Sequence, residues 1–279
     1  MLAKRIPTIL PNLTYEEALE ITKIHSLAGE LQEDLITKRP FRAPHYTVSA
    51  SSLIGGGKIP KPGEISLAHY GVLFLDELPE FNRTTLEVLR GPLENRKITI
   101  NRVTTTVSYP SNFILIASMN PCECGYYGSN LKKCTCNPKS IKKYVGKISG
   151  PILDRIDLHV EVKPVEYDKL ALGGKAETSK EIKKRVDNAR KIQAERYKGL
   201  GILCNAELAS NLLEKFCKLD KKGRDIMEKA FAKFSLTARA HDKILKIART
   251  IADLDNSKEI QYQHIAEAIQ YRSLDIKYF

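Results

Sequence analysis

The chain has 279 residues, of which 42% are hydrophobic and 28% charged, a composition typical of a globular protein with a sizeable core. Its net charge of +12, from 45 Lys and Arg against 33 Asp and Glu, suits a polyanionic partner such as nucleic acid, although ordinary surface charge gives the same total. Apolar runs stay well below the roughly 18 residues of a membrane span, and residues 1–13 lack a secretory apolar region. We therefore expect a cytoplasmic protein without a membrane partner.

The first half of the chain alternates short apolar strands with helical segments and loops, which predicts an α/β fold. Residues 72–75 and 113–117 are apolar throughout, as expected for strands of a parallel sheet that are covered on both faces. Between them, residues 82–90 have a helical period that Gly91-Pro92 should end or bend. Residues 97–107 are rich in β-branched side chains and broken in the middle, which predicts a β-hairpin.

The pattern changes after Pro164, and helical periodicity dominates the rest of the chain. We expect domains at 1–165 and 179–279, with a linker at 166–178 that contains a Gly-Gly pair. Ser179 and Thr237 have the residue type of helix N-caps. After the helix that starts near Ser179, further helices are expected at residues 206–217, 224–234, 238–254 and 263–271.

Polar side chains follow both apolar strands of the predicted sheet. Asp76 and Glu77 come directly after the first strand, at the end where ligands bind in open α/β sheets. Paired acids there suit a nucleotide-bound Mg²⁺ and an attacking water, Asp76 holding the metal and Glu77 orienting or deprotonating the water. Asn120 follows the second strand and is placed to orient the same water. The ordinary alternatives are a strand that ends in acidic loop residues and an asparagine that serves a turn.

Four cysteines, Cys122, Cys124, Cys134 and Cys136, form two C-x-C pairs separated by nine residues. Four thiolates in so short a segment can close a tetrahedral Zn²⁺ site, although C-x₂-C is the usual spacing. Free thiols in a reducing compartment are the alternative, and disulfides are not expected there. The remaining two cysteines, at positions 204 and 217, are expected to be small core residues.

Three long stretches resemble the magnesium-chelatase-like AAA+ ATPases of the ComM and YifB type. They are residues 39–81, residues 118–162 with MNPCECGYYG and ISGPILDRIDLHVEV, and residues 236–254 with LTARAHDKILKIARTIADL. The resemblance covers essentially the whole chain. It implies an AAA+ P-loop NTPase core, with a parallel sheet flanked by helices and β-hairpin inserts, followed by an α-helical lid. It also implies ATP with Mg²⁺, action on DNA as a hexameric ring, and a structural Zn²⁺ in the cysteine-containing loop.

The resemblance implies roles for individual residues. Asp76 and Glu77 correspond to the Walker B acids, and Asn120 to the first sensor. Arg155 corresponds to the arginine finger, whose guanidinium stabilises charge on the phosphoryl group of a neighbouring subunit's nucleotide. Without the resemblance, an ion pair with a nearby aspartate would be favoured for it. Arg239 corresponds to the second sensor, in the first turn of a helix where amides and a guanidinium together suit a phosphate.

The family also implies two insertions, a loop or hairpin at 55–61 and the hairpin at 97–107. In related ring-shaped motors such hairpins line the central pore and grip DNA. Lys58, Lys61 and Arg102 are therefore candidate contacts to the phosphate backbone, which would be independent of sequence and sensitive to salt. Solvated basic side chains on surface loops are the alternative interpretation.

One part of the family pattern is missing. A phosphate-binding loop, G-x-x-x-x-G-K-[ST], should precede a helix that reads like residues 1–11, and it occurs nowhere in the chain. We expect the chain to lack the family's N-terminal domain and first core strand, which leaves a sheet edge exposed, and alone to hydrolyse ATP negligibly. The leading hypothesis is a fragment of an ATP-driven DNA motor for branch migration in recombination or transformation. The alternatives are a magnesium-chelatase subunit and a non-catalytic, zinc-containing DNA-binding or assembly module.

Overall fold

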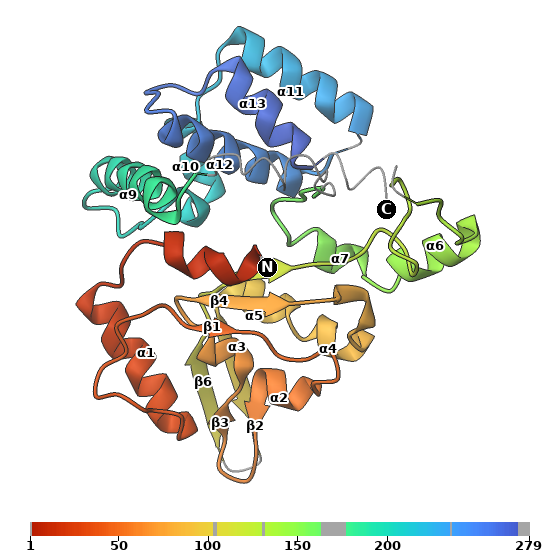
Figure 1. Cartoon of the computed structure of the whole chain (residues 1–279). Helices are drawn as coiled ribbons and strands as arrows, with labels where there is room; N and C mark the ends of the chain where they lie inside the picture. The colour runs from red at the N-terminus through yellow and green to blue at the C-terminus, as the bar shows by residue number, and fades with distance from the viewer. Residues whose placement is uncertain (1, 103–104, 130–131, 163–176, 235, 273–279) are drawn as a thin grey trace. The chain divides into compact units, whose positions relative to one another are not determined.

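The computed structural model describes residues 2–102, 105–129, 132–162, 177–234 and 236–272 (Figure 1). It divides into two compact units, Met1–Ile156 and Asp157–Phe279, and each unit has its own hydrophobic core. The predicted linker at 166–178 lies outside the described residues apart from its last two positions. Within the described ranges, the helices are all too short or too polar to cross a membrane.

The first unit is built on a three-stranded parallel sheet in the order β1-β4-β7, with strands Phe41–Arg42, Val72–Leu75 and Ile114–Ala117. The central strand β4 buries all four of its side chains, as its composition predicts. Strand β7 pairs with β4 over its whole length, yet Ile114 is 45% exposed. The prediction of a strand covered on both faces is therefore wrong for β7. Among the described strands it has a neighbour on one side only, and an edge strand is less covered than a central one.

Short helices complete the first unit. They are η1 (Ala3–Ile9), α1 (Tyr15–Ala28), α2 (Ala50–Ile54), α3 (Glu64–Leu67), η2 (Leu78–Glu80), α4 (Arg83–Glu87), α5 (Arg90–Asn95), α6 (Pro138–Val145) and α7 (Gly150–Leu153). The helix predicted at 82–90 corresponds to α4, which ends at Glu87, earlier than predicted and before Gly91-Pro92. That pair lies in α5 instead, where Pro92 is in the first turn and its missing N–H removes no helical hydrogen bond.

Two antiparallel hairpins also belong to the first unit. They are β2 (Gly55–Gly56) with β3 (Lys61–Pro62), and β5 (Lys97–Asn101) with β6 (Thr106–Pro110). The hairpin predicted at 97–107 is confirmed and extends to Pro110. Ile98, Ile100 and Tyr109 face the core, so the period of two along the strands sets which side is buried. Gly55 has a φ of +98°, and a Cβ there would lie 2.2 Å from the Lys61 carbonyl oxygen, so the first hairpin requires glycine.

The second unit is helical, which confirms the predicted α-helical lid. Its helices are α9 (Ser179–Arg196), η3 (Asn205–Glu207), α10 (Ser210–Phe216), α11 (Lys221–Phe234), α12 (Ala238–Leu254) and α13 (Tyr262–Gln270). The helix predicted at 206–217 is interrupted, because Leu208 and Ala209 have extended backbones between η3 and α10. Cys217 is buried as expected, whereas Cys204 is only half-buried.

The sequence predicted the N-cap residues of two helices in this unit, and the structure confirms one of them. Thr237 caps α12 as predicted, with its hydroxyl accepting from the Ala240 amide at 3.2 Å. The predicted cap at Ser179 is wrong, because Thr178 caps α9 instead. The Thr178 hydroxyl accepts from the Glu181 amide at 3.3 Å, and the Glu181 carboxylate accepts from the Thr178 amide at 2.8 Å. This reciprocal capping box requires Glu three residues after the cap, which selects Thr178 over its neighbour.

A buried carboxylate organises the interior of the second unit. Asp253 is fully buried and pairs with the guanidinium groups of Arg196 and Arg249. The side-chain amide of Asn205 donates to the same carboxylate at 2.9 Å, and the Tyr197 hydroxyl donates to Asn205. The hydrogen bond to Asp253 raises the pKa of Arg196, whereas burial lowers the pKa of Arg249. This network joins α9, η3 and α12, and the sequence pattern did not indicate it.

Candidate functional site

Asp76 and Ser118 meet at the carboxyl ends of β4 and β7. The two strands are paired with Leu75 opposite Ala117, so the next residue of each strand lies beside the other. The Ser118 hydroxyl donates a hydrogen bond to Asp76 Oδ1, and the Glu77 amide donates to the same oxygen at 3.1 Å. Asp76 is nevertheless exposed. Its carboxylate is thus oriented by the chain and remains accessible to a ligand from solvent.

Glu77 adopts a left-handed backbone conformation, with φ +54° and ψ +48°. Non-glycine residues in this region cost on the order of 1 kcal/mol, and such strain gathers at functional sites. The turn is held because the Leu78 amide donates to the Ser118 carbonyl at 2.9 Å, across the two strands. Hydrogen bonds to Ser118, the residue after β7, therefore help to fix the positions of the two adjacent acids.

Asn120 lies two residues beyond Ser118 and is exposed. Its side chain lies against a turn of the following loop, since a Cβ added to Gly125 would be 3.9 Å from Asn120 Cγ. Tyr144, a buried side chain of α6, lies within electrostatic reach of Glu77 and Glu80. Burial raises the pKa of Tyr144, and the charges of Glu80 and Glu77 add to this, whereas the Asn120 backbone lowers it.

We call Asp76, Glu77, Ser118 and Asn120 the carboxyl edge. Hydrogen bonds join Asp76 to Glu77 and Ser118, and Asn120 follows Ser118 by two residues. Sequence reasoning missed Ser118, and it missed Tyr144, whose phenol lies within reach of the charges of Glu77 and Glu80. Ser118 could have been found by aligning the ends of the two predicted strands, because it occupies the position equivalent to Asp76. Tyr144 carries no local signal, since it returns to this edge from a helix more than twenty residues further along the chain.

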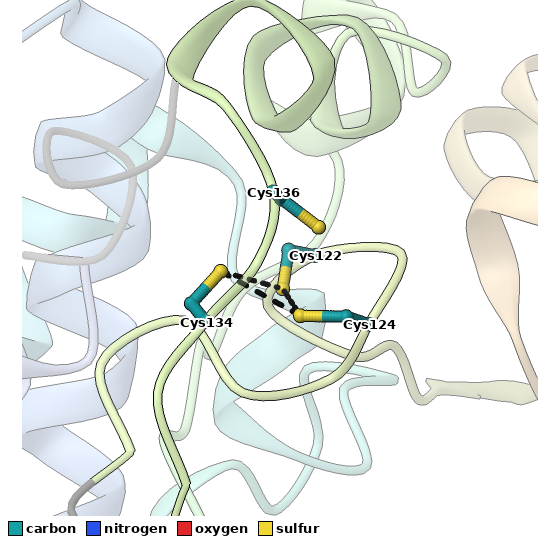
Figure 2. Close-up of side chains that lie close together, drawn as sticks. All are labelled: Cys122, Cys124, Cys134 and Cys136. Atoms are coloured by element: carbon teal, nitrogen blue, oxygen red, sulfur yellow. Dashed lines mark hydrogen bonds between the residues drawn. The ribbon is translucent and has the colours of Figure 1, made fainter.

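The four predicted metal ligands come together in one cluster, and Figure 2 shows their side chains converging. The sulfur of Cys122 lies 3.4 Å from that of Cys124 and 3.7 Å from that of Cys134, and all four sulfurs lie within 4.8 Å of one another. Tetrahedral Zn²⁺ with Zn–S distances of about 2.3 Å separates its sulfurs by about 3.8 Å. The geometry and the four soft donors fit Zn²⁺.

The protein surroundings of the thiols favour a cation. Backbone amides of Tyr126 and Thr135 lower the pKa of Cys124 to about 5, which stabilises a thiolate. Burial and hydrogen bonds with the neighbouring thiols together raise the pKa of Cys134 to about 12. Neighbouring thiolates repel one another, and a bound divalent cation would offset that repulsion. The Tyr127 amide also donates to Cys122 Sγ at 3.3 Å.

Arg155, the predicted arginine finger, is folded against its own unit in this structure. Its Nη2 donates to Glu94 Oε2 at 2.6 Å, its Nη1 donates to the Pro151 carbonyl at 2.7 Å, and the side chain is only 13% exposed. The partner is thus Glu94 and neither of the neighbouring acids, Asp154 and Asp157. To reach another subunit's nucleotide, this guanidinium would have to exchange the Glu94 carboxylate for a phosphate.

Arg239, the predicted second sensor, lies in the second unit. It is the second residue of α12, directly after Ala238, and it is exposed. The N-cap hydroxyl of Thr237 satisfies the Ala240 amide of the same turn. Arg239 is therefore carried on a well-capped helix end, the position at which amides and a basic side chain suit an anion.

The three predicted DNA contacts lie on adjoining hairpins. The Tyr109 hydroxyl in β6 donates to the Pro60 carbonyl at 2.7 Å, and Figure 1 shows β6 beside β2 and β3. A Cβ added to Gly56 would lie 3.1 Å from Arg102 Nη2, so Arg102 reaches the hairpin that carries Lys58 and Lys61. All three basic side chains are exposed. We call these three residues the hairpin cations.

Comparisons with known proteins agree along the whole chain. Residues 1–170 match the family model for magnesium chelatase subunit ChlI, and residues 176–272 match the model for its C-terminal part. Competence protein ComM of Haemophilus influenzae is 44% identical over 276 residues, which cover 98% of this chain and 53% of that protein. YifB of Escherichia coli is 44% identical over 279 residues, 99% of this chain and 54% of that protein. Magnesium-chelatase subunit ChlI of Bigelowiella natans is 26% identical over 115 residues, 41% of this chain and 26% of that protein.

Proposed function

The chain belongs to the magnesium-chelatase ChlI family, with an AAA+-type α/β core and a helical lid, and we propose that it is part of an ATP-dependent motor acting on DNA. The chain spans about half the length of the ComM and YifB relatives. The observation that carries the proposal is the carboxyl edge, where an exposed and oriented Asp76 lies beside Glu77 and two residues of β7's continuation. The name of the ComM relative supports a role in competence, and branch migration during transformation is the activity proposed for the whole motor.

The residues of the carboxyl edge divide the work of phosphoryl transfer. Asp76, oriented by the Ser118 hydroxyl and the Glu77 amide, would hold Mg²⁺. Glu77 orients or deprotonates the attacking water, and Asn120 positions that water from the neighbouring strand. ATP with Mg²⁺ supplies the phosphoryl group when bound. Arg155 and Arg239 supply positive charge to the phosphates, Arg155 from a neighbouring copy of a ring, for which a hexamer is proposed.

The chain contains no phosphate-binding loop of the form G-x-x-x-x-G-K-[ST], so we expect it to hydrolyse ATP negligibly by itself. The test is a fusion of this chain to the first half of the E. coli YifB relative, compared with the chain alone. The fusion should show ATPase activity that DNA stimulates, and the chain alone should not. Full turnover by the chain alone, or a fusion whose activity ignores DNA, would contradict the proposal.

The hairpin cations are proposed to contact the DNA backbone. Replacing Lys58 and Lys61 by Gln should weaken binding of this chain to single- and double-stranded DNA equally and reduce the slope of log K against log salt by about 1 per lysine. Exchanging Lys198 and Lys218, two exposed lysines of the second unit, for Gln provides a matched control. If the salt slope of the hairpin variant is unchanged, or if the control loses as much DNA affinity, the hairpin cations do not contact DNA.

The cysteine cluster is proposed to hold one structural Zn²⁺. Metal analysis of the purified chain should find about one zinc per chain, and Co²⁺ in its place should show thiolate charge-transfer absorption. Both signals should be lost when Cys124 and Cys134 are replaced by Ser. If the purified protein contains no zinc, takes up no Zn²⁺ and shows no such absorption with Co²⁺, the cysteines are free thiols and the proposal is wrong.

A non-catalytic DNA-binding module is the second candidate, favoured by the pairing of Arg155 with Glu94. DNA binding by the chain, together with a fusion that lacks ATPase activity, would support this candidate over the motor. A chelatase subunit is less favoured, because the Bigelowiella natans relative that bears that name matches less than half of the chain.

A further inference from the structure

Much of the positive charge of the chain gathers in one short segment of the first unit. Residues 124–153 contain six lysines and no Asp, Glu or Arg, so they carry half of the net charge of +12. All six lysines are exposed. Among the described residues, one of them pairs with Glu80 and the other five have no ion pair. The six are Lys132, Lys133, Lys139, Lys142, Lys143 and Lys147, of which Lys147 is the paired one.

Helix α6 places three of these lysines on one face. Lys139, Lys142 and Lys143 are three or four residues apart, so they are neighbours on the surface of the helix. The other face packs inward, because Tyr144 and Val145 are only 4% and 2% exposed. The packing of Tyr144 and Val145 therefore turns the basic face of α6 to solvent.

Two tyrosine rings lie at the surface of the loop before α6. We call this loop, in its described residues 122–129 and 132–136, the cysteine loop. Tyr126 and Tyr127 are 37% and 42% exposed, and they open a tight turn in which the Ser129 amide donates to the Tyr126 carbonyl at 3.0 Å. Gly128, the third residue of this turn, has a φ of +75°, which a residue with a Cβ adopts only with strain. The turn thus presents two adjacent aromatic rings to solvent.

The cysteine cluster brings the tyrosines and the lysines together. The sulfur of Cys134 lies 3.7 Å from that of Cys122, so the chain before Cys134 returns to the turn that carries the tyrosines. Lys132 Nζ accordingly lies 5.0 Å from the centroid of the Tyr126 ring. The Tyr127 amide donates to Cys122 Sγ at 3.3 Å, which ties the second tyrosine to the same cluster. The loop therefore combines exposed rings with exposed cations, and the basic face of α6 follows it directly in the chain.

We propose that the cysteine loop and α6 bind single-stranded DNA, with the rings of Tyr126 and Tyr127 stacked on unpaired bases and the lysines on the phosphates. Every base has a π-face, so stacking of this kind is independent of sequence, and the lysines add a salt-sensitive attraction to the backbone. In a duplex the neighbouring base pairs cover those faces, so the rings select single strands. The inference rests on the proposed action on DNA and adds to it a second contact surface, away from the hairpin cations, with a preference for one form of DNA.

The test is binding of the purified chain to a labelled oligothymidylate and to a duplex of the same length. Replacing both Tyr126 and Tyr127 by Ala should weaken binding to the single strand by about tenfold or more and change duplex binding by less than about twofold. Replacing both by Phe keeps the rings and should keep the single-strand affinity. Tyr15 and Tyr262, which are 69% and 50% exposed, provide a matched control, and their replacement by Ala should change neither affinity.

The lysines are tested through the salt dependence of single-strand binding. Replacing Lys142 and Lys143 by Gln should reduce the slope of log K against log salt by about 0.7 per lysine. The variant with Gln at Lys198 and Lys218 is again the control and should keep the slope. An unchanged slope in the α6 variant would remove α6 from the proposed surface and overturn the inference as stated.

Three further outcomes would contradict the inference. One is an equal loss of single-strand and duplex affinity in the alanine variant, and another is a loss in the phenylalanine variant as large as that with alanine. The third is a chain that binds neither form of DNA, which would overturn the proposed contacts of the hairpin cations as well. If only the hairpin variant loses affinity, the inference alone is wrong. The motor proposal is judged separately, by the ATPase activity of the fusion.

Discussion

The polar groups of the first unit and those of the second unit are held in opposite ways. The first unit has the carboxyl edge and the four-cysteine cluster, and the second unit has the Asp253 network. Asp253 is fully buried, and two guanidinium groups and an amide saturate its carboxylate. Asp76 and Glu77 are exposed, Glu77 has a left-handed backbone, and the four sulfurs crowd one another. The buried cluster has every partner that it needs within the chain. The exposed groups remain accessible from solvent, as the proposed ligands require.

The comparison predicts its largest effect on stability at Asp253. Asp253→Asn removes one charge and leaves the Arg249 guanidinium buried without its counter-ion, which should cost about 3 to 5 kcal/mol of unfolding free energy. Denaturant unfolding of the chain would measure the loss. Asp225→Asn, at an exposed position of α11, should change stability by less than about 0.5 kcal/mol. A loss at Asp253 no larger than that of Asp225 would show that the network contributes no more than surface charge.

At the carboxyl edge, removal of a charge should affect turnover and leave the fold intact. Glu77→Gln should lower kcat of the fusion with the YifB first half by about a hundredfold or more, the contribution of a general base. The unfolding free energy should stay unchanged, because the Glu77 side chain is exposed. Turnover at the wild-type rate would mean that Glu77 neither orients nor deprotonates the attacking water.

Replacing Glu77 by glycine should have a smaller effect on stability than the change at Asp253, and it should raise the unfolding free energy. Glu77→Gly relieves the positive φ of +54° and should stabilise the first unit by up to about 1 kcal/mol, while turnover is lost. Arg96→Gly is the matched control, because Arg96 has the same φ of +54° at the end of α5. It should stabilise the unit to a similar degree and keep activity. Destabilisation by both changes would show that the left-handed turns carry no strain.

The smallest effect is expected at the Arg155–Glu94 pair. Glu94 is 50% exposed, so solvent screens the ion pair, and Glu94→Gln should cost less than about 1 kcal/mol of unfolding free energy. If Arg155 acts in a neighbouring subunit, this change should not lower kcat of the fusion, whereas Arg155→Ala should. Equal loss of turnover in both variants would indicate that Arg155 works through Glu94 within its own subunit.

Local pattern was enough to predict much of the fold. The apolar strand of residues 72–75, the hairpin after Lys97 and the helix Ala238–Leu254 each bury a face whose period is visible in the residues themselves. Errors had two sources. Ile114 is exposed because β7 has only one neighbour among the described strands, which its own residues do not show. The cap of α9 was misplaced by one residue because the capping box with Glu181 was overlooked.

The four cysteines and the two acids after β4 were determined by the sequence alone, because ligands close together in the chain need only a turn to meet. Only the tertiary structure decided how Ser118 orients Asp76 and that Arg155 pairs with Glu94. These contacts join residues far apart along the chain. They depend on strand register and on where a helix returns, which local pattern does not encode. At the carboxyl edge, the sequence was enough to predict the two acids, and the structure showed that Ser118 orients Asp76.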